Sequence, residues 1–259
     1  MKNKALEKLK NGEKLIGTFF PHFDPDAVEC LGMTGLDFVI LDTEHGPGGV
    51  METMSMIRAA ELQGLTPFVR IKDTSRESIL KLLDVGAQAL VIPNISSVQE
   101  AREVVEYAKY FPLGKRGVAY ARTAGWGFSD EASGMSVREY FEFANKNTMV
   151  ILQCETVECL ESIEEIVGTD GVDGIFVGPF DLSTSLGIPK EFDSPVFTAA
   201  LERILSACRA AGKPCHVFCP DNATARLRLS QGFDSVAVNT DLAVYVQAFR
   251  SLVREVLDK

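Results

Sequence analysis

The sequence predicts an α/β protein of the (β/α)8 TIM-barrel class, and three observations support this fold. Short apolar segments alternate with segments of helical periodicity along nearly all of the 259 residues. Eight such β/α units in about 250 residues match the size of a TIM barrel. Several apolar runs, such as "ALVIPNI" (89–95), are continuous rather than alternating. Strands of this kind are buried on both faces, which indicates a parallel sheet.

The predicted strands are apolar runs separated by helical segments, most of which end in glycine, as a helix C-terminus favours. The strands cover residues 14–20, 38–44, 67–71, 89–95, 149–155, 174–179, 214–219 and 235–240. A doubly wound sheet is the alternative, but no GxGxxG turn follows the first strand. No linker interrupts the pattern, so residues 1–259 are expected to form a single domain.

The longest insertion covers residues 111–147, between the fourth and fifth predicted strands. It is rich in glycine, arginine and aromatic residues and contains the only tryptophan, Trp126. Long insertions in barrels commonly form lids over the active site or interfaces between subunits. We therefore expect one of these two roles for this segment.

Composition and charge exclude several classes of partner. The net charge is −10, from 26 basic and 36 acidic residues, with no basic block, so neither nucleic acid nor an anionic membrane surface is expected. The N-terminal segment "MKNKALEKLKNGEK" lacks the apolar region of a signal peptide. No apolar run approaches the ~20 residues of a membrane span. The six cysteines lack a disulfide-framework spacing, which favours free thiols and a cytoplasmic protein.

Polar residues follow the predicted strands at their C-terminal ends, where TIM barrels place their active sites. The opposite ends carry mostly glycine and small residues. This asymmetry predicts a catalytic rim. Its members are Glu44, His45, Arg70, Asn94, Gln153, Glu155, Asp181, His216, Asn239 and Asp241.

Two carboxylates on this rim suit a divalent cation. Gln153 and Glu155 are two residues apart on one strand and therefore share a face. Asp181 follows the next strand, and two protein carboxylates leave coordination positions for water and substrate, as Mg²⁺ or Mn²⁺ prefers. As alternatives, Asp181 is an ordinary helix N-cap and Glu155 is a solvated or ion-paired strand end.

Arg70 and His45 are candidates for substrate binding and proton transfer. Arg70 ends an apolar strand, where its guanidinium can bind an anionic substrate or a developing oxyanion. The alternative is an ion pair with a neighbouring carboxylate. His45 is a candidate general base, with a structural histidine as the alternative. No strand ends in the lysine that a Schiff-base aldolase requires, so that mechanism is disfavoured.

These residues, in this order, resemble the HpcH/HpaI aldolase family, the metal-dependent pyruvate aldolases of the phosphoenolpyruvate/pyruvate barrel superfamily. The matching segments span nearly the whole chain. They are "GLDFVILDTEHGP" (35–47), "PFVRI" (67–71), "LLDVGAQALVIP" (82–93), "KRGVAYAR" (115–122), "ILQCE" (151–155), "GVDGIFVGPFDLS" (171–183) and "GFDSVAVNTD" (232–241).

The resemblance implies that Glu155 and Asp181 bind the metal, with Gln153 close by. The expected ions are Mg²⁺ or Mn²⁺, with Co²⁺ and Zn²⁺ as further candidates. It also implies that Arg70 contacts the keto oxygen of the substrate. His45 would belong to the acid/base machinery, supported by Asp84.

The resemblance further concerns substrate binding and assembly, and a third expectation concerns the turn after the second strand. The backbone amides of the segment Gly178, Pro179, Phe180 and Asp181 would hold the pyruvate carboxylate at a helix start. Members of the family form homohexamers, built as trimers of dimers, and exchange their last helix between paired subunits. In "VILDTEHGPGG" (39–49), Asp42 and Glu44 would support His45, and the glycines would allow a tight turn.

The implied activity is that of a class II aldolase, which cleaves a 4-hydroxy-2-oxo acid to pyruvate and an aldehyde through an enolate. The alternatives are a decarboxylating carbon–carbon bond former of the macrophomate synthase type, an acyl-CoA lyase, and a non-catalytic barrel that binds keto acids. Four residues depart from the family pattern and leave the aldehyde unassigned: Phe180, His216, Phe218 and Asn239.

Overall fold

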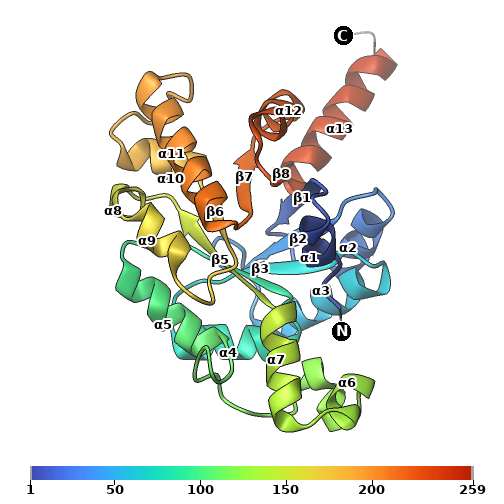
Figure 1. Cartoon of the computed structure of the whole chain (residues 1–259). Coiled ribbons are helices and arrows are strands. Elements are labelled where there is room, and N and C mark those ends of the chain that lie inside the picture. The colour runs from blue at the N-terminus through green and yellow to red at the C-terminus, as the bar shows by residue number, and fades with distance from the viewer. Residues whose placement is uncertain (1, 258–259) are drawn as a thin grey trace.

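The computed structural model describes residues 2–257, in which eight parallel strands close into a barrel in sequence order (Figure 1). Pairing of β1 with β8 closes the sheet, so the predicted TIM barrel is confirmed. The strands are β1 (Leu15–Phe20), β2 (Phe38–Asp42), β3 (Thr66–Arg70), β4 (Ala89–Ile92), β5 (Met149–Cys154), β6 (Gly174–Val177), β7 (Cys215–Cys219) and β8 (Ser235–Thr240).

Helices connect the strands, and most begin at a Ser, Thr, Asp or Asn whose side chain accepts a hydrogen bond from a backbone N–H of the first turn. They are α1 (Lys4–Lys10), α2 (Pro25–Gly32), α3 (Val50–Leu62), α4 (Arg76–Val85), α5 (Val98–Ala108), the 3₁₀ helix η1 (Arg122–Gly127), α6 (Asp130–Gly134), α7 (Val137–Asn147), α8 (Val157–Glu161), α9 (Ile163–Gly168), α10 (Pro179–Ser185), α11 (Pro195–Ala211), α12 (Asn222–Gln231) and α13 (Asp241–Leu257).

Side chains point alternately into and out of the barrel along each strand, and this alternation separates two apolar layers. Phe38 and Ile40 of β2 point into the barrel, together with Phe68 of β3. Val39 and Leu41 face outward into the layer between the sheet and the helices. Since successive side chains point to opposite faces, the parity of a residue decides whether it reaches the barrel interior.

The helix α1 closes the barrel at the N-terminal ends of the strands. This helix was not predicted from the sequence. Its Ala5 belongs to the interior cluster, and the Ala5 N–H donates to Thr66 Oγ1 at 3.2 Å. The helix has seven residues, three of them lysine, so its apolar pattern is too short to identify it from periodicity.

The insertion between α5 and β5 forms η1, α6 and α7 at the N-terminal end of the barrel (Figure 1). Arg122 there donates to the carbonyl of Val85, at the end of α4, at 3.0 Å and pairs with Glu61 near the end of α3. The role of a lid over the mouth of its own barrel is therefore wrong, because α5 has already returned the chain to the opposite end. The other expected role, an interface between subunits, is compatible with this position.

The last helix, α13, runs away from the barrel (Figure 1). It contains no buried residue, and apolar side chains such as Val246, Phe249 and Val253 are exposed. Beside its start, a hollow of about 480 Å³ lies on the outer face of β1, with Ile16 and Leu31 in its lining. Within residues 2–257, no helix has the length and apolarity needed to cross a membrane.

Candidate active site

Four of the predicted rim residues, His45, Arg70, Gln153 and Asp181, line a cavity of about 300 Å³ at the C-terminal ends of the strands. Its lining combines polar residues with aromatic ones. These residues are Phe19, Pro21, Asp42, His45, Arg70, Gln153, Phe176, Gly178, Pro179, Phe180, Asp181, Phe218 and Thr240. The Glu155 side chain lies next to this lining, beside Gly178.

Arg70 is fixed by two carboxylates from strand β2 and the turn that follows it. Its Nε donates to Asp42 Oδ1 at 2.9 Å and its Nη2 to Asp42 Oδ2 at 2.5 Å, while Nη1 lies 3.1 Å from Glu44 Oε2. Burial opposes the charge of the guanidinium, but Asp42 and Glu44 outweigh it and raise the Arg70 pKa. Arg70 is thus an ion-paired group and also a cationic wall of the cavity.

The turn after β2 presents His45 at the cavity rim. Asp42 Oδ1 accepts hydrogen bonds from the backbone N–H groups of Glu44 at 3.1 Å and His45 at 3.4 Å. Gly46 is required here, because a Cβ would lie 2.2 Å from the carbonyl oxygen of Asp42. The His45 side chain is exposed to solvent at the edge of the lining.

Glu155 is a buried carboxylate with no basic side chain as a hydrogen-bond partner among the described residues. Its Oε1 accepts the backbone N–H of Asn94 at 2.7 Å, and its Oε2 accepts the amide of Gln153. Burial raises the Glu155 pKa to about 7, although both hydrogen bonds act to lower it. The negative charges of Asp181 and Glu44 raise it further. Arg70 interacts electrostatically with Glu155, but the ionised carboxylate has no ion-pair partner among the described residues.

The donor atoms at this position fit a hard divalent cation. The Glu155 and Asp181 carboxylates interact electrostatically, and Gln153 Oε1 is a buried oxygen with no hydrogen-bond partner among the described residues. A Cβ on Gly178 would lie 2.6 Å from Glu155 Oε2, so glycine keeps this space open. Residues 2–257 contain no group of three His, Cys, Asp or Glu side chains arranged for a metal. The oxygen atoms that suit such a cation are those of the Glu155 and Asp181 carboxylates and of the Gln153 side-chain amide.

At the start of α10, fewer backbone amides are available for a substrate carboxylate than the sequence predicted. The Gly178 N–H donates to the carbonyl of Cys154 at 3.3 Å within the barrel, and Pro179 has no N–H. Only the amides of Phe180 and Asp181 can therefore serve an anion, since the first N–H groups of a helix lack intrahelical acceptors.

Four predicted residues lie away from the cavity. Asp84 is in the last turn of α4, at the N-terminal end of the barrel, and accepts a hydrogen bond from Arg116 at 2.8 Å. Within one chain it is therefore not placed beside His45. His216 is enclosed in the barrel interior, where its Nδ1 pairs with Ser235 Oγ, so its expected place on the rim is wrong. Asn239 does not line the cavity, whereas its neighbour Thr240 does. Asp241 lines the hollow on the outer face of β1 instead.

Sequence reasoning missed the aromatic residues that support the site from other strands, and it did not identify how Asn94 contributes. The Arg70 guanidinium carbon lies 4.8 Å from the centre of the Phe19 ring, and Asn94 supplies a backbone rather than a side-chain donor to Glu155. Phe176 forms part of the floor. The inward parity of Phe19 was the available signal for that residue, because it lies four residues from the interior residue Leu15 on the same strand.

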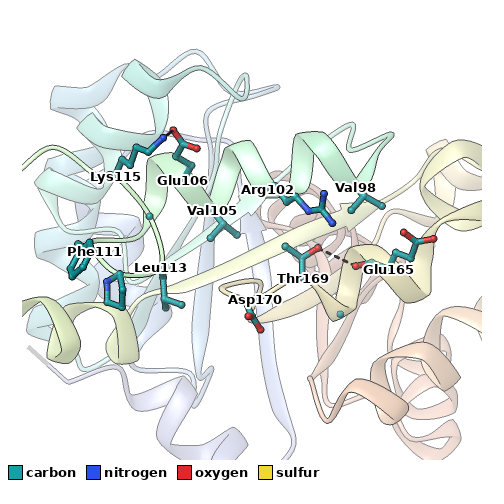
Figure 2. A pocket seen from close by; sticks show the side chains of 13 residues that line it. Val98, Arg102, Val105, Glu106, Phe111, Leu113, Lys115, Glu165, Thr169 and Asp170 are labelled. Atoms are coloured by element: carbon teal, nitrogen blue, oxygen red, sulfur yellow. Dashed lines mark hydrogen bonds and ion pairs between the residues drawn. The ribbon is translucent and has the colours of Figure 1, made fainter.

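A larger groove, of about 820 Å³, lies along α5 beside α9 and contains none of the predicted site residues (Figure 2). Its charged side chains include Glu106 and Lys115, which pair with each other at 2.8 Å. Arg102, Glu165 and Asp170 also line it. Chemistry is better supported at the smaller cavity, where an arginine, a histidine and two carboxylates converge.

A closed parallel barrel with a polar cavity at the C-terminal ends of its strands has the architecture of the TIM-barrel enzymes. The chain belongs to the HpcH/HpaI aldolase/citrate lyase family, whose profile matches residues 15–248. The predicted family and its lyase activity of the aldolase type are confirmed. Enzymes of this family depend on a divalent metal ion.

Individual relatives agree over nearly the full length of the chain. The 2-keto-3-deoxy-L-rhamnonate aldolase of Salmonella gallinarum is 33% identical, covering 97% of this chain and 92% of the relative. A crystal structure of an HpcH/HpaI aldolase/citrate lyase family protein from Burkholderia cenocepacia superposes with a TM-score of 0.89 at 31% identity, covering 98% and 99% of the two chains. Macrophomate synthase superposes with a TM-score of 0.83 at 25% identity, covering 99% and 90%.

Proposed function

We propose that the chain is a class II aldolase that interconverts a 4-hydroxy-2-oxo acid with pyruvate and an aldehyde. The observation that carries this proposal is the convergence of Arg70, His45, Glu155 and Asp181 at one cavity. Glu155 and Asp181, with Gln153 close by, would hold Mg²⁺ or Mn²⁺. When bound, such an ion supplies a Lewis acid that polarises the oxo-acid oxygens.

Arg70 orients the oxo acid and stabilises negative charge on its keto oxygen. The bidentate pair with Asp42 presets the guanidinium plane, so no reorganisation is required when the enolate forms. The amides of Phe180 and Asp181 are available to the carboxylate of the oxo acid at the start of α10.

His45 is the proposed base in cleavage. It removes the proton from the C4 hydroxyl, the C3–C4 bond breaks, and the electron pair of that bond passes into the enolate of pyruvate. The aldehyde leaves, and protonation of the enolate carbon gives pyruvate. In synthesis the same groups act in reverse order.

Exchange of the pyruvate methyl protons in D₂O, with Mg²⁺ or Mn²⁺ and with EDTA as control, tests the enolate step without any aldehyde. The expected result is metal-dependent exchange that Glu155→Ala and Asp181→Ala abolish. Glu158→Gln, which removes an exposed carboxylate on α8, is the matched control and should exchange normally. Absence of metal-dependent exchange in the intact protein contradicts the proposal.

A decarboxylating reaction is the second candidate, supported by the similarity to macrophomate synthase. It uses the same enolate but forms it by loss of CO₂ from oxaloacetate. Release of CO₂ from oxaloacetate, faster than methyl-proton exchange of pyruvate, would favour this candidate over the aldolase.

We also propose that α13 is exchanged between paired subunits of a homohexamer. The exposed apolar residues of α13 and the apolar hollow on the outer face of β1 support this assembly, because each would be buried by a second copy. Six free cysteines, five of them buried, support a reducing, cytoplasmic compartment.

A further inference from the structure

One wall of the cavity is built from four phenylalanines that come from four separate segments. The Phe19 ring lies 5.7 Å from those of Phe176 and Phe218, and the Phe218 ring lies 5.7 Å from that of Phe180. All of these contacts have tilted or edge-to-face geometry, as favourable aromatic pairs do. The rings therefore form one continuous apolar surface.

Further rings hold this wall from behind. The His216 ring stacks on Phe176 with a centroid distance of 6.3 Å and an interplanar angle of 7°. Phe192 packs edge-on against Phe180 at 5.3 Å and in turn contacts Phe197 of α11. Because the backing groups are themselves packed, the wall is a preformed surface rather than a set of free side chains.

Several polar groups of the cavity are already engaged by protein partners. Asp42 is paired with Arg70, and the Gln153 amide donates to Glu155. Among the polar side chains that line the cavity, Thr240 is the one outside the acid–base and metal groups, and its Oγ1 accepts the N–H of Ala243 at 3.4 Å. A hydroxylated ligand chain against the phenylalanines would lose hydrogen bonds to water without replacing them.

We propose that the aromatic wall is the subsite for the aldehyde part of the substrate, and that it selects an apolar, flat or branched group. This inference rests on the proposed aldolase function. The substrate class is then a 4-hydroxy-2-oxo acid with an apolar substituent on C4, and Phe180 and Phe218 determine specificity.

The position of Phe19 links this subsite to the chemistry. Its ring contacts Phe176 and Phe218 and also lies under the Arg70 guanidinium. An oxo acid held at Arg70 therefore has its reactive C3 next to the aromatic wall. In synthesis, C3 of the enolate attacks the carbonyl carbon of the aldehyde. The aldehyde oxygen takes a proton from His45 and becomes the C4 hydroxyl, while the apolar substituent rests on the phenylalanines.

The test compares kcat/KM for aldol addition of pyruvate to apolar and hydroxylated aldehydes. Benzaldehyde and 2-methylpropanal are the apolar probes, and glycolaldehyde and glyceraldehyde are the hydroxylated ones. Hydroxyl groups beside the carbonyl make an aldehyde intrinsically more electrophilic, so a preference for the apolar probes reports the pocket. The expected preference is about tenfold or more.

Variants locate the preference on the wall. Phe180→Ala and Phe218→Ser should each reduce the ratio of apolar to hydroxylated kcat/KM by about tenfold, mainly through the KM of the apolar aldehyde. Phe128→Ala removes a phenylalanine that is 88% exposed in the distant insertion and should keep the wild-type ratio. A ratio that is the same in all three variants contradicts the assignment of these residues.

Measurements on the wild-type protein alone distinguish failure of the aromatic subsite from failure of the aldolase function. Methyl-proton exchange together with a preference for hydroxylated aldehydes overturns the aromatic subsite and leaves the aldolase function standing. Absence of methyl-proton exchange in the wild-type protein overturns the aldolase function, and the proposed subsite with it. Exchange together with the apolar preference supports both.

Discussion

The carboxylate of Asp42 accepts two hydrogen bonds from the guanidinium of Arg70, one from Nε at 2.9 Å and one from Nη2 at 2.5 Å. The two residues are directly paired across neighbouring strands, β2 and β3. This pair fixes the one cationic side chain in the cavity lining, and the same Asp42 oxygen also holds the backbone of His45.

Asp42→Asn should therefore impair the reaction although Asp42 is not proposed to touch the substrate. An amide can accept one of the two hydrogen bonds but presents N–H groups to the guanidinium at the other. A displaced Arg70 is expected to lower the methyl-proton exchange rate by about 100-fold. Asp26→Asn, at an exposed position on α2, is the control. A wild-type exchange rate in a folded Asp42→Asn protein would show that this pair has no part in positioning Arg70.

Glu155→Gln is expected to separate metal binding from stability. The substitution keeps the shape and an acceptor oxygen for Asn94 but removes a negative charge that burial disfavours. Calorimetric titration with Mn²⁺ should show affinity weakened by about 100-fold or more. Thermal unfolding in EDTA at pH 8 should give a Tm equal to or above that of the wild type, because Glu155, with a pKa of about 7, is mostly ionised at that pH. A lower Tm with intact Mn²⁺ binding would assign Glu155 a structural role instead.

His216 should make the protein less stable as pH falls. Burial lowers its pKa to about 4, whereas the unfolded chain has a value near 6.5. Between these values the unfolded state binds the proton more tightly, so the free energy of unfolding decreases from pH 6.5 toward pH 4, by up to about 3 kcal/mol. Urea unfolding at several pH values measures this slope.

The control for that slope is the double variant His216→Leu, Ser235→Ala, which removes the ring and its hydrogen-bond partner together. Glu155 acts in the opposite direction, since its raised pKa favours the folded state as pH falls. The difference between wild type and the double variant isolates His216. Equal slopes in the two proteins would mean that His216 binds its proton equally well in the folded and unfolded states.

Phe249→Glu should disrupt the proposed exchange of α13. The side chain is 52% exposed in a single chain but would be buried by a partner, where a carboxylate is costly. Light scattering after size-exclusion chromatography should show the wild type well above the 28.3 kDa of one chain and the variant shifted toward it. Gln247→Glu adds the same charge at a polar position of α13 and should leave the mass unchanged. A wild-type protein that elutes as a monomer would contradict the proposal.

The sequence by itself determined the barrel and the chemical identity of its rim. Continuous apolar strands and helical periodicity are local patterns, and in a barrel the C-terminal ends of all strands meet at one face. Arg70, Gln153 and Asp181 could therefore be assigned to one site from their positions relative to the strands. The shared face of Gln153 and Glu155 followed from strand alternation alone.

Only the tertiary structure decided which side chains touch across the barrel. Closure of β1 against β8 brings Phe19 beside Phe176 and Phe218, and parity alone does not give that contact because it depends on strand stagger. The same geometry placed Asp84 at the opposite end from His45, since α4 returns the chain to the start of β4. The depth of a residue in the barrel likewise separates enclosed His216 from Phe218, which lines the cavity two residues further along the same strand.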